Sequence, residues 1–173
     1  MFSRRAANTD ALQPEVANET TVILRSVRPE DHSFLERVYA STRADELAPV
    51  PWSNEQKAQF CRMQFDAQTL HYRKHYPAAS FQVIELNGVP AGRLYVDRWA
   101  REIRIVDITL LPEHRGTGVG TRLLNELREE ARAAGKSLTI HVERFNPALR
   151  LYERLGFRKI GEAGVHDLME WKG

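Results

Sequence analysis

Hydrophobic and polar residues follow different periods in the two halves of this chain. In the first half, an alternating segment over 21–28 predicts a strand, and apolar residues three and four positions apart predict two helices. The first helix begins at Pro29-Glu30-Asp31. The second begins at Ser53, where Gln56 completes a capping-box pattern, and ends before Pro77. The stripe expected to be buried on this second helix consists of Phe60, Met63, Ala67 and Leu70.

The second half of the chain is dominated by strands. Asn87-Gly88 lies between two alternating segments and is typical of a tight hairpin turn. Gly135 ends a helical segment that is apolar on one side. The expected strands are 81–86, 89–97, 102–111, 137–143 and a final hairpin over 157–171, and the expected helices are 117–134 and 148–155. This order predicts an α/β fold with a central mixed sheet and helices on both faces.

Composition and charge narrow the functional classes. The length of 173 residues indicates a single domain over 21–173, preceded by a polar extension over 1–20 that is expected to be flexible. The net charge of +2, from 25 basic and 23 acidic residues, argues against a nucleic-acid partner. No apolar run approaches the length of a membrane span. Cys61 is the only cysteine, so a reducing, cytoplasmic location is expected.

The turn Arg115-Gly116-Thr117-Gly118-Val119-Gly120 joins a predicted strand to a predicted helix. Its three alternate glycines let the backbone approach a ligand closely. The first turn of a helix has unpaired N–H groups and a partial positive charge, so a pyrophosphate is the expected ligand, with the Arg115 charge beside it. The turn lacks the Gly-Lys-Ser/Thr ending of a P-loop, and Thr121 stands where the dinucleotide fingerprint has glycine. Taken alone, the pattern also fits a merely tight turn.

Two motifs together resemble the GNAT superfamily of N-acetyltransferases. Arg115–Gly120 is similar to its Arg/Gln-x-x-Gly-x-Gly/Ala motif, and the preceding strand ends, as in that family, with Ile108-Thr109-Leu110-Leu111-Pro112. Downstream, Asn146 to Phe157 resembles the family's Asn…Leu-Tyr-x-x-x-Gly-Phe helix. The resemblance implies the GNAT acyl-CoA N-acyltransferase fold, with a mostly antiparallel sheet that is splayed between strands 4 and 5. It further implies acetyl-CoA as co-substrate and no metal.

The resemblance also assigns roles to individual residues. It implies that the main chain of Ile108, Thr109 and Leu110 binds the pantetheine arm as an added strand. Asn146 would contact the pantetheine or fix the following helix, and Tyr152 would lie near the thioester sulfur. The pyrophosphate would be bound by the backbone N–H groups of Gly116, Gly118, Val119 and Gly120, with Arg115 and Thr117 nearby and the Thr121 hydroxyl as an addition.

Acetyl transfer to an amine requires a proton acceptor and a proton donor. Tyr152 is the expected donor, although it could also be a plain core residue. His141 and Glu143 share the polar face of one strand and are the first candidates for the base, with Asp107 and Glu102 in reserve. Some relatives have a glutamate on the preceding strand, where this chain has Arg104. For each candidate base, a surface ion pair is the alternative.

The acceptor is the least determined part of the prediction. In the resembled family it is shaped by the first two helices, here 31–76, a stretch rich in aromatic residues that could equally be core. The expected reaction is direct attack by a primary amine of a small-molecule or amino-acid-like acceptor. A protein or peptide acceptor and a non-catalytic acyl-CoA sensor remain alternatives, and the resemblance allows a homodimer. Four arginines could bind an acceptor carboxylate but are expected mainly as a solvated strand edge: Arg93, Arg98, Arg101 and Arg104.

Overall fold

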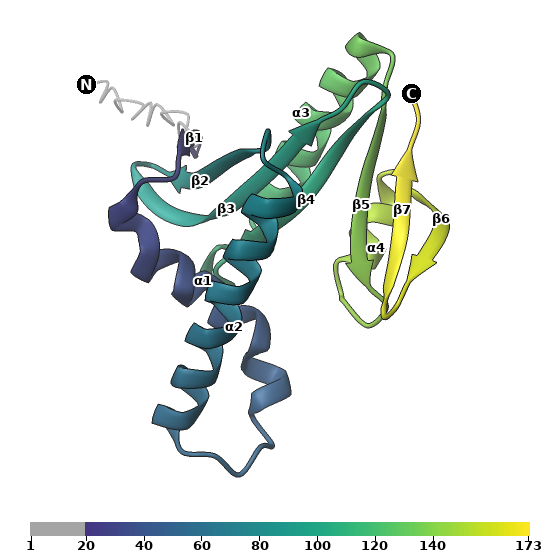
Figure 1. The fold of residues 1–173 in the computed structure, drawn as a ribbon. Coiled ribbons are helices and arrows are strands. Elements are labelled where there is room, and N and C mark those ends of the chain that lie inside the picture. The colour runs from purple at the N-terminus through teal and green to yellow at the C-terminus, as the bar shows by residue number, and fades with distance from the viewer. Residues whose placement is uncertain (1–19) are drawn as a thin grey trace, which may run out of the picture.

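The alternating segments of the sequence form one sheet of seven strands in the order β1-β2-β3-β4-β5-β7-β6 (Figure 1). The computed structural model describes residues 20–173, so the extension expected over 1–20 lies outside the described residues except for Thr20. The strands are β1 Val22–Ser26, β2 Ser80–Leu86, β3 Val89–Arg98, β4 Glu102–Leu110, β5 Ser137–Glu143, β6 Arg158–Ala163 and β7 His166–Trp171. The helices are α1 His32–Leu47, α2 Asn54–His75, α3 Val119–Ala134 and α4 Leu149–Arg154, with single 3₁₀ turns at Pro29–Asp31 and Pro112–His114.

Helices cover both faces of the sheet. One face packs against α3 and α4 around a large core that includes Leu94, Ile105 and Leu124. The other face packs against α1 and α2 around a smaller core that includes Leu35 and Phe65. Every neighbouring pair of strands is antiparallel except β4 and β5, which are parallel. The predicted mixed, mostly antiparallel α/β architecture is therefore confirmed.

The sheet opens between β4 and β5. These strands pair only from Glu102–Ile105 on β4 to Ser137–Ile140 on β5. Both strands continue beyond that point, β4 to Leu110 and β5 to Glu143, and they part from each other (Figure 1). The splay expected between strands 4 and 5 is present. It leaves the main-chain edge of residues 106–110 without a strand partner on the β5 side.

The stripe expected to be buried on α2 is wrong at three of its four positions, and only Phe60 is half-buried. Met63 and Leu70 are 58% and 70% exposed, and Ala67 is also exposed, whereas Cys61 and Phe65 are buried. The inward side of α2 continues from Phe65 through Gln68 and Tyr72, which bond to buried polar groups of the sheet. Because these inward positions are partly polar, the more apolar stripe of the helix was the misleading one.

Candidate active site

The glycine turn before α3 leaves its backbone open to the outside. Gly116 and Gly118 have φ of 72° and 86°, the left-handed region that residues with a side chain rarely adopt. A Cβ placed on Gly116, Gly118 or Gly120 would meet no atom within 4 Å. No side chain caps the first N–H groups of α3, which begins at Val119, two residues later than expected. Open space before unpaired amides and a positive helix end suits an anionic ligand.

The side chains around this turn are held by the protein itself. The Arg115 guanidinium donates through Nε to the Leu110 carbonyl at 2.9 Å and through Nη2 to Ser41 Oγ of α1 at 3.3 Å. The Thr117 hydroxyl donates to the His114 carbonyl at 2.9 Å and so stabilises the turn. Thr121 is half-buried in the first turn of α3. Arg115 therefore ties the turn to the end of β4 and to α1, and contact of these side chains with a ligand stays a prediction.

The short helix α4 carries the second motif. The Asn146 Oδ1 accepts the Ala148 N–H at 2.9 Å, so this side chain stabilises the turn that leads into a helix of only six residues. Tyr152 is 5% exposed and packs edge-on against Phe157. Burial raises the pKa of the Tyr152 hydroxyl, and the negative charge of Asp107 raises it further. The phenol thus stays protonated at neutral pH, as a proton donor must, and it is a weaker acid than a free tyrosine.

Asp107 lies in a buried polar cluster on the unpaired part of β4. Its carboxylate accepts two bonds from Arg93 of β3, with Nη2–Oδ2 and Nε–Oδ1 distances of 2.7 and 3.2 Å. The Tyr72 hydroxyl of α2 donates at 3.1 Å and the Thr109 hydroxyl at 2.8 Å. Arg93 also donates to Gln68 at 2.9 Å. With both oxygens occupied by donors, Asp107 is poorly placed to take a proton from a substrate.

His141 lies near the point where β4 and β5 separate. Its Nδ1 is 3.1 Å from Arg104 Nη1, and because a guanidinium can only donate, Nδ1 is the acceptor and the neutral ring carries its proton on Nε2. Burial lowers the pKa of His141, and the charge of Arg104 lowers it further. Arg104 also donates to Thr139 and to Glu102. His141 is thus neutral near pH 7, but its basic nitrogen is already occupied.

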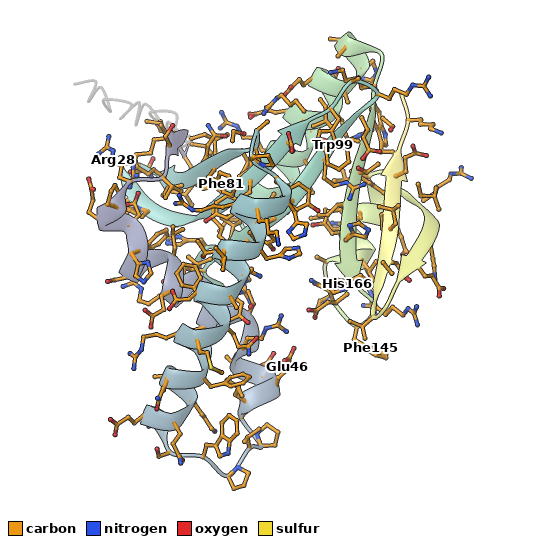
Figure 2. All side chains as sticks on the ribbon, viewed as in Figure 1. Arg28, Glu46, Phe81, Trp99, Phe145 and His166 are labelled. Carbon is orange, nitrogen blue, oxygen red and sulfur yellow. The ribbon has the colours of Figure 1, made fainter. Side chains whose placement is uncertain are left out.

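Glu143 forms an ion pair that spans the splay. Its Oε1 is 3.3 Å from Arg43 Nη2 of α1 and 3.8 Å from His166 Nε2 of β7. The Arg43 and Glu143 side chains are 25% and 38% exposed, so both remain accessible to a small molecule. Among the described residues, Glu143 accepts one hydrogen bond, from Arg43, and Glu102 likewise accepts one, from Arg104, but Glu102 lies in the paired part of β4, away from the opening. Figure 2 labels Glu46, near the end of α1, and His166, at the start of β7.

Several site residues were missed or misjudged from the sequence. Arg93 and Arg104 are only 2% and 8% exposed, which contradicts the expected solvated strand edge. They are buried because each has a partner for its charge, Asp107 and Glu102 respectively. Nothing in the sequence marks Arg43 as a site residue, because Glu46 three residues later predicts an ordinary intrahelical ion pair. The structure also contains that pair. Tyr72 lies in the aromatic-rich stretch 31–76, where nothing in the sequence distinguishes it from a core residue.

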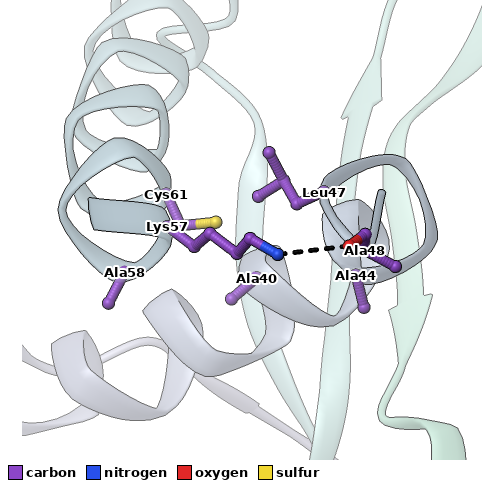
Figure 3. A pocket seen from close by; sticks show the side chains of 7 residues that line it. All are labelled: Ala40, Ala44, Leu47, Ala48, Lys57, Ala58 and Cys61. Atoms are coloured by element: carbon purple, nitrogen blue, oxygen red, sulfur yellow. Dashed lines mark hydrogen bonds between the residues drawn. The ribbon is translucent and has the colours of Figure 1, made fainter. Parts of the chain in front are cut away.

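Cys61 lies away from this site, beside a cavity of about 210 Å³ between α1 and α2 (Figure 3). Alanines line most of the cavity, and the Lys57 ammonium donates to the Ala48 carbonyl at 3.3 Å beside it. Burial raises the pKa of the Cys61 thiol, which disfavours the reactive thiolate. The structure thus gives no support for an acyl-cysteine intermediate.

The comparisons with known proteins identify the family. A sequence model described as the acetyltransferase (GNAT) family matches residues 36–157, and the chain belongs to this family. It is 41% identical over 80 residues to an acetyltransferase of Agrobacterium fabrum, an alignment covering 45% of this chain and 56% of the relative. It is 37% identical over 86 residues to streptothricin acetyltransferase of Streptomyces lavendulae, covering 47% and 46%. The chain thus spans about half the length of these relatives.

Solved structures agree with the fold. The chain resembles the PaiA N-acetyltransferase of Thermoplasma acidophilum in complex with coenzyme A, with a TM-score of 0.67, 19% identity, and coverage of 88% of this chain and 99% of that one. It also resembles spermidine N-acetyltransferase of Vibrio cholerae in complex with CoA and spermine, with a TM-score of 0.56, 21% identity, and coverage of 86% and 92%. Both likenesses support the predicted GNAT fold.

Across residues 20–173, every helix is too short or too polar to cross a bilayer. Over the same range, no group of three or more His, Cys, Asp or Glu side chains is arranged to hold a metal ion.

Proposed function

We propose that this protein is an acetyl-CoA-dependent N-acetyltransferase that acts on the primary amine of a small, amino-acid-like acceptor by direct attack. The observation that carries the proposal is the opening between β4 and β5, which has the glycine turn directly beyond the end of β4. A free strand edge followed by an open set of amides provides two consecutive binding surfaces for one elongated ligand. Acetyl-CoA, with a peptide-like arm and a pyrophosphate, has this chemistry.

The binding roles follow from these two surfaces. The free main-chain edge at Ile108, Thr109 and Leu110 would bind the amide groups of pantetheine as an additional strand would. The amides of Gly116, Gly118, Val119 and Gly120 would bind the pyrophosphate, assisted by the positive end of the 16-residue helix α3. The main-chain amide of Leu110 could also stabilise the oxyanion of the tetrahedral intermediate.

The reaction needs one proton acceptor and one proton donor. The amine nitrogen attacks the thioester carbonyl carbon, a C–N bond forms, and the C–S bond then breaks. Glu143, directly or through a water molecule, takes the proton from the amine, and Tyr152 gives its proton to the departing CoA thiolate. The saturated bonding of Asp107, the occupied Nδ1 of His141 and the position of Glu102 in the paired part of β4 favour Glu143 over the other candidates.

The Arg43–Glu143 ion pair supports the choice of acceptor class. An α-amino acid carries an ammonium group and a carboxylate a few bonds apart. Such a zwitterion could replace the direct Arg43–Glu143 contact. Its ammonium group would bind Glu143, and its carboxylate would bind Arg43. Glu143 would then already hold the amine that it deprotonates. A plain amine would satisfy Glu143 but take that carboxylate away from Arg43, which would keep its intrahelical pair with Glu46.

The test combines calorimetric binding of acetyl-CoA with detection of the free CoA thiol. The acceptor panel contains amino acids, the matched amines without the carboxylate, and peptides. We expect acetyl-CoA to bind and thiol release to be fastest with amino acids. Thiol release with peptides alone would favour the second candidate, a peptide acetyltransferase, and binding without release across the panel would favour an acyl-CoA sensor. Failure to bind acetyl-CoA would refute the proposal.

A pair of variants tests the acceptor class separately. Arg43→Gln should raise KM about tenfold for amino acids, the effect of losing one charge-assisted hydrogen bond, and leave KM for the matched amines nearly unchanged. Arg37→Gln, on the exposed side of the same helix, is the control and should change neither value. Equal effects of Arg43→Gln on both acceptor types would exclude a carboxylate at Arg43.

A further inference from the structure

A second cavity, of about 260 Å³, lies between α2 and the sheet on the side of β2 and β3. Its walls are aromatic, with Phe65, Tyr72, Phe81 and Tyr95 among the lining residues. The Phe81 and Tyr95 rings meet at 4.9 Å, and the Tyr72 and Tyr95 rings are nearly perpendicular at 6.0 Å. In Figure 2, Phe81 lies to the left of α2, whereas His166 beside the splay lies to the right. This cavity is therefore separate from the acetyl-CoA surfaces.

The rim of this cavity is basic. Arg28 and Arg73 line it and are exposed, and neither side chain has an acidic partner within ion-pair distance in residues 20–173. His32 also lines it and lies 3.9 Å from Asp66. Asp31, three residues from Arg28, pairs with Arg25 at 2.7 Å. The cavity thus combines an aromatic interior with two unpaired guanidinium groups at its mouth.

We propose that this cavity binds a small carboxylate with one aromatic ring as an effector of the enzyme. The ring would pack among Phe65, Phe81 and Tyr95, and the carboxylate would bind Arg28 or Arg73, since guanidinium groups suit carboxylates. The volume is below the usual range for a drug-sized ligand, which limits the ligand to roughly ten or so non-hydrogen atoms. An amine of the same shape would be repelled by the rim.

Tyr72 connects this cavity to the active site. Its ring forms part of the cavity wall, and its hydroxyl donates to Asp107 on the unpaired part of β4. Tyr95, also in the wall, lies beside Arg93, whose guanidinium carbon is 5.4 Å from the ring centre. A ligand that shifts Tyr72 would therefore alter the Arg93–Asp107 cluster next to the pantetheine edge. Binding of the ligand goes beyond the proposed acetyl transfer, whereas this coupling rests on it.

Binding is tested first, without acetyl-CoA, so that its failure is distinct from a failure of the proposed activity. The probe is phenylacetate, measured by calorimetry and by amide chemical-shift changes, with phenethylamine as the control of opposite charge. We expect saturable binding of phenylacetate, weakened about tenfold or more by Arg73→Gln or Arg28→Gln. Lys74→Gln, next to Arg73 but outside the cavity lining, should bind as the wild type does. Equal binding of phenethylamine would overturn the proposal. Unchanged affinity for phenylacetate in the Arg28→Gln/Arg73→Gln double variant would also overturn it.

Coupling is tested second, in the acetyl-transfer assay. Phenylacetate should change KM or kcat without competing with the acceptor. Tyr72→Phe should keep phenylacetate binding but remove this kinetic effect, because the bond to Asp107 is lost. Simple competition with the acceptor would make the cavity part of the acceptor site and overturn the effector role. A kinetic effect that persists in Tyr72→Phe would overturn transmission through Tyr72.

Discussion

Substituting Asp107 separates its structural role from a catalytic one. In Asp107→Ala, the Arg93 side chain, which is 2% exposed in this structure, loses both bonds to its carboxylate partner. Breaking a buried ion pair in this way costs about 3–5 kcal/mol. The partly buried Tyr72 hydroxyl loses its hydrogen-bond acceptor at the same time. Since a domain is stable by only about 5–15 kcal/mol, this single change should remove a large share of the folding free energy.

The assay is urea denaturation followed by circular dichroism, with the slope of the transition compared between variants. Arg93→Met/Asp107→Ala is the informative second variant, because it removes the buried charge together with its partner. It should be more stable than Asp107→Ala alone, since replacing a whole buried pair is often neutral. Asp66→Ala, on the exposed side of α2 with its side chain 65% exposed, is the control and should change stability by less than about 0.5 kcal/mol.

Two results would refute this reasoning. The first is a loss of stability below about 1 kcal/mol in Asp107→Ala, the level expected of an exposed ion pair. The second concerns Asp107→Asn, which preserves shape. If Asp107→Asn kept full stability but abolished turnover with acetyl-CoA still bound, Asp107 would be the base and the assignment to Glu143 would fall.

Three further predictions concern the proposed site. Gly118→Asp should abolish acetyl-CoA binding by calorimetry, because a carboxylate would repel the pyrophosphate; Gly164→Asp, also at positive φ with open space around it but in the β6–β7 turn, is the matched control and should bind normally. Tyr152→Phe should lower kcat about 100-fold or more with acetyl-CoA affinity nearly unchanged, and full turnover would remove Tyr152 as the acid. The lowered pKa of His141 means that the folded state prefers the neutral ring, so its contribution to stability is present above pH 6.5 and is lost as the pH falls below that value. His141→Gln should flatten this part of the stability–pH curve measured by denaturation, and an unchanged curve would contradict the shift.

Much of the site could be predicted because it consists of backbone. The ligand contacts proposed for the glycine turn are N–H groups, and the positions proposed to lack a side chain are visible as Gly116, Gly118 and Gly120 in the sequence. Asn87-Gly88 likewise fixed the β2–β3 hairpin, and both residues have the positive φ that such a turn requires. Local chemistry of this kind depends on neighbouring residues, and therefore it can be read along the chain.

The buried polar cluster could not be predicted in the same way. Tyr72, Arg93 and Asp107 come from three elements that are 14 to 35 residues apart. Each residue alone is typical of an exposed surface. Burial is acceptable only because the three side chains form hydrogen bonds and an ion pair with one another. The same reason explains the error on α2, where the inward stripe contains Gln68 and Tyr72 because the sheet beneath them carries these charges.

Gly92 is a further feature that the sequence did not reveal. It has no unusual φ, yet a Cβ there would overlap the Thr109 carbonyl oxygen and lie 3.0 Å from the Leu110 Cα. β3 therefore approaches the unpaired part of β4 so closely that only glycine fits. The position of this part of β4 is therefore fixed by close packing against β3 and by the Arg93–Asp107 ion pair.

A β-bulge links these observations to the chemistry of the opening. Tyr95 of β3 faces Asp107 of β4 while Val96 faces Ile105, so Val106 is an extra residue on β4. Before the bulge, Ile103 and Ile105 face the core beneath α3, and after it Ile108 and Leu110 do. Without this change of parity, strict alternation would direct Asp107 and Thr109 into the α3 core. The bulge instead turns Asp107 toward α2 at the place where β4 leaves β5, and therefore one extra residue both creates the polar cluster and ends the strand pairing that would otherwise close the site.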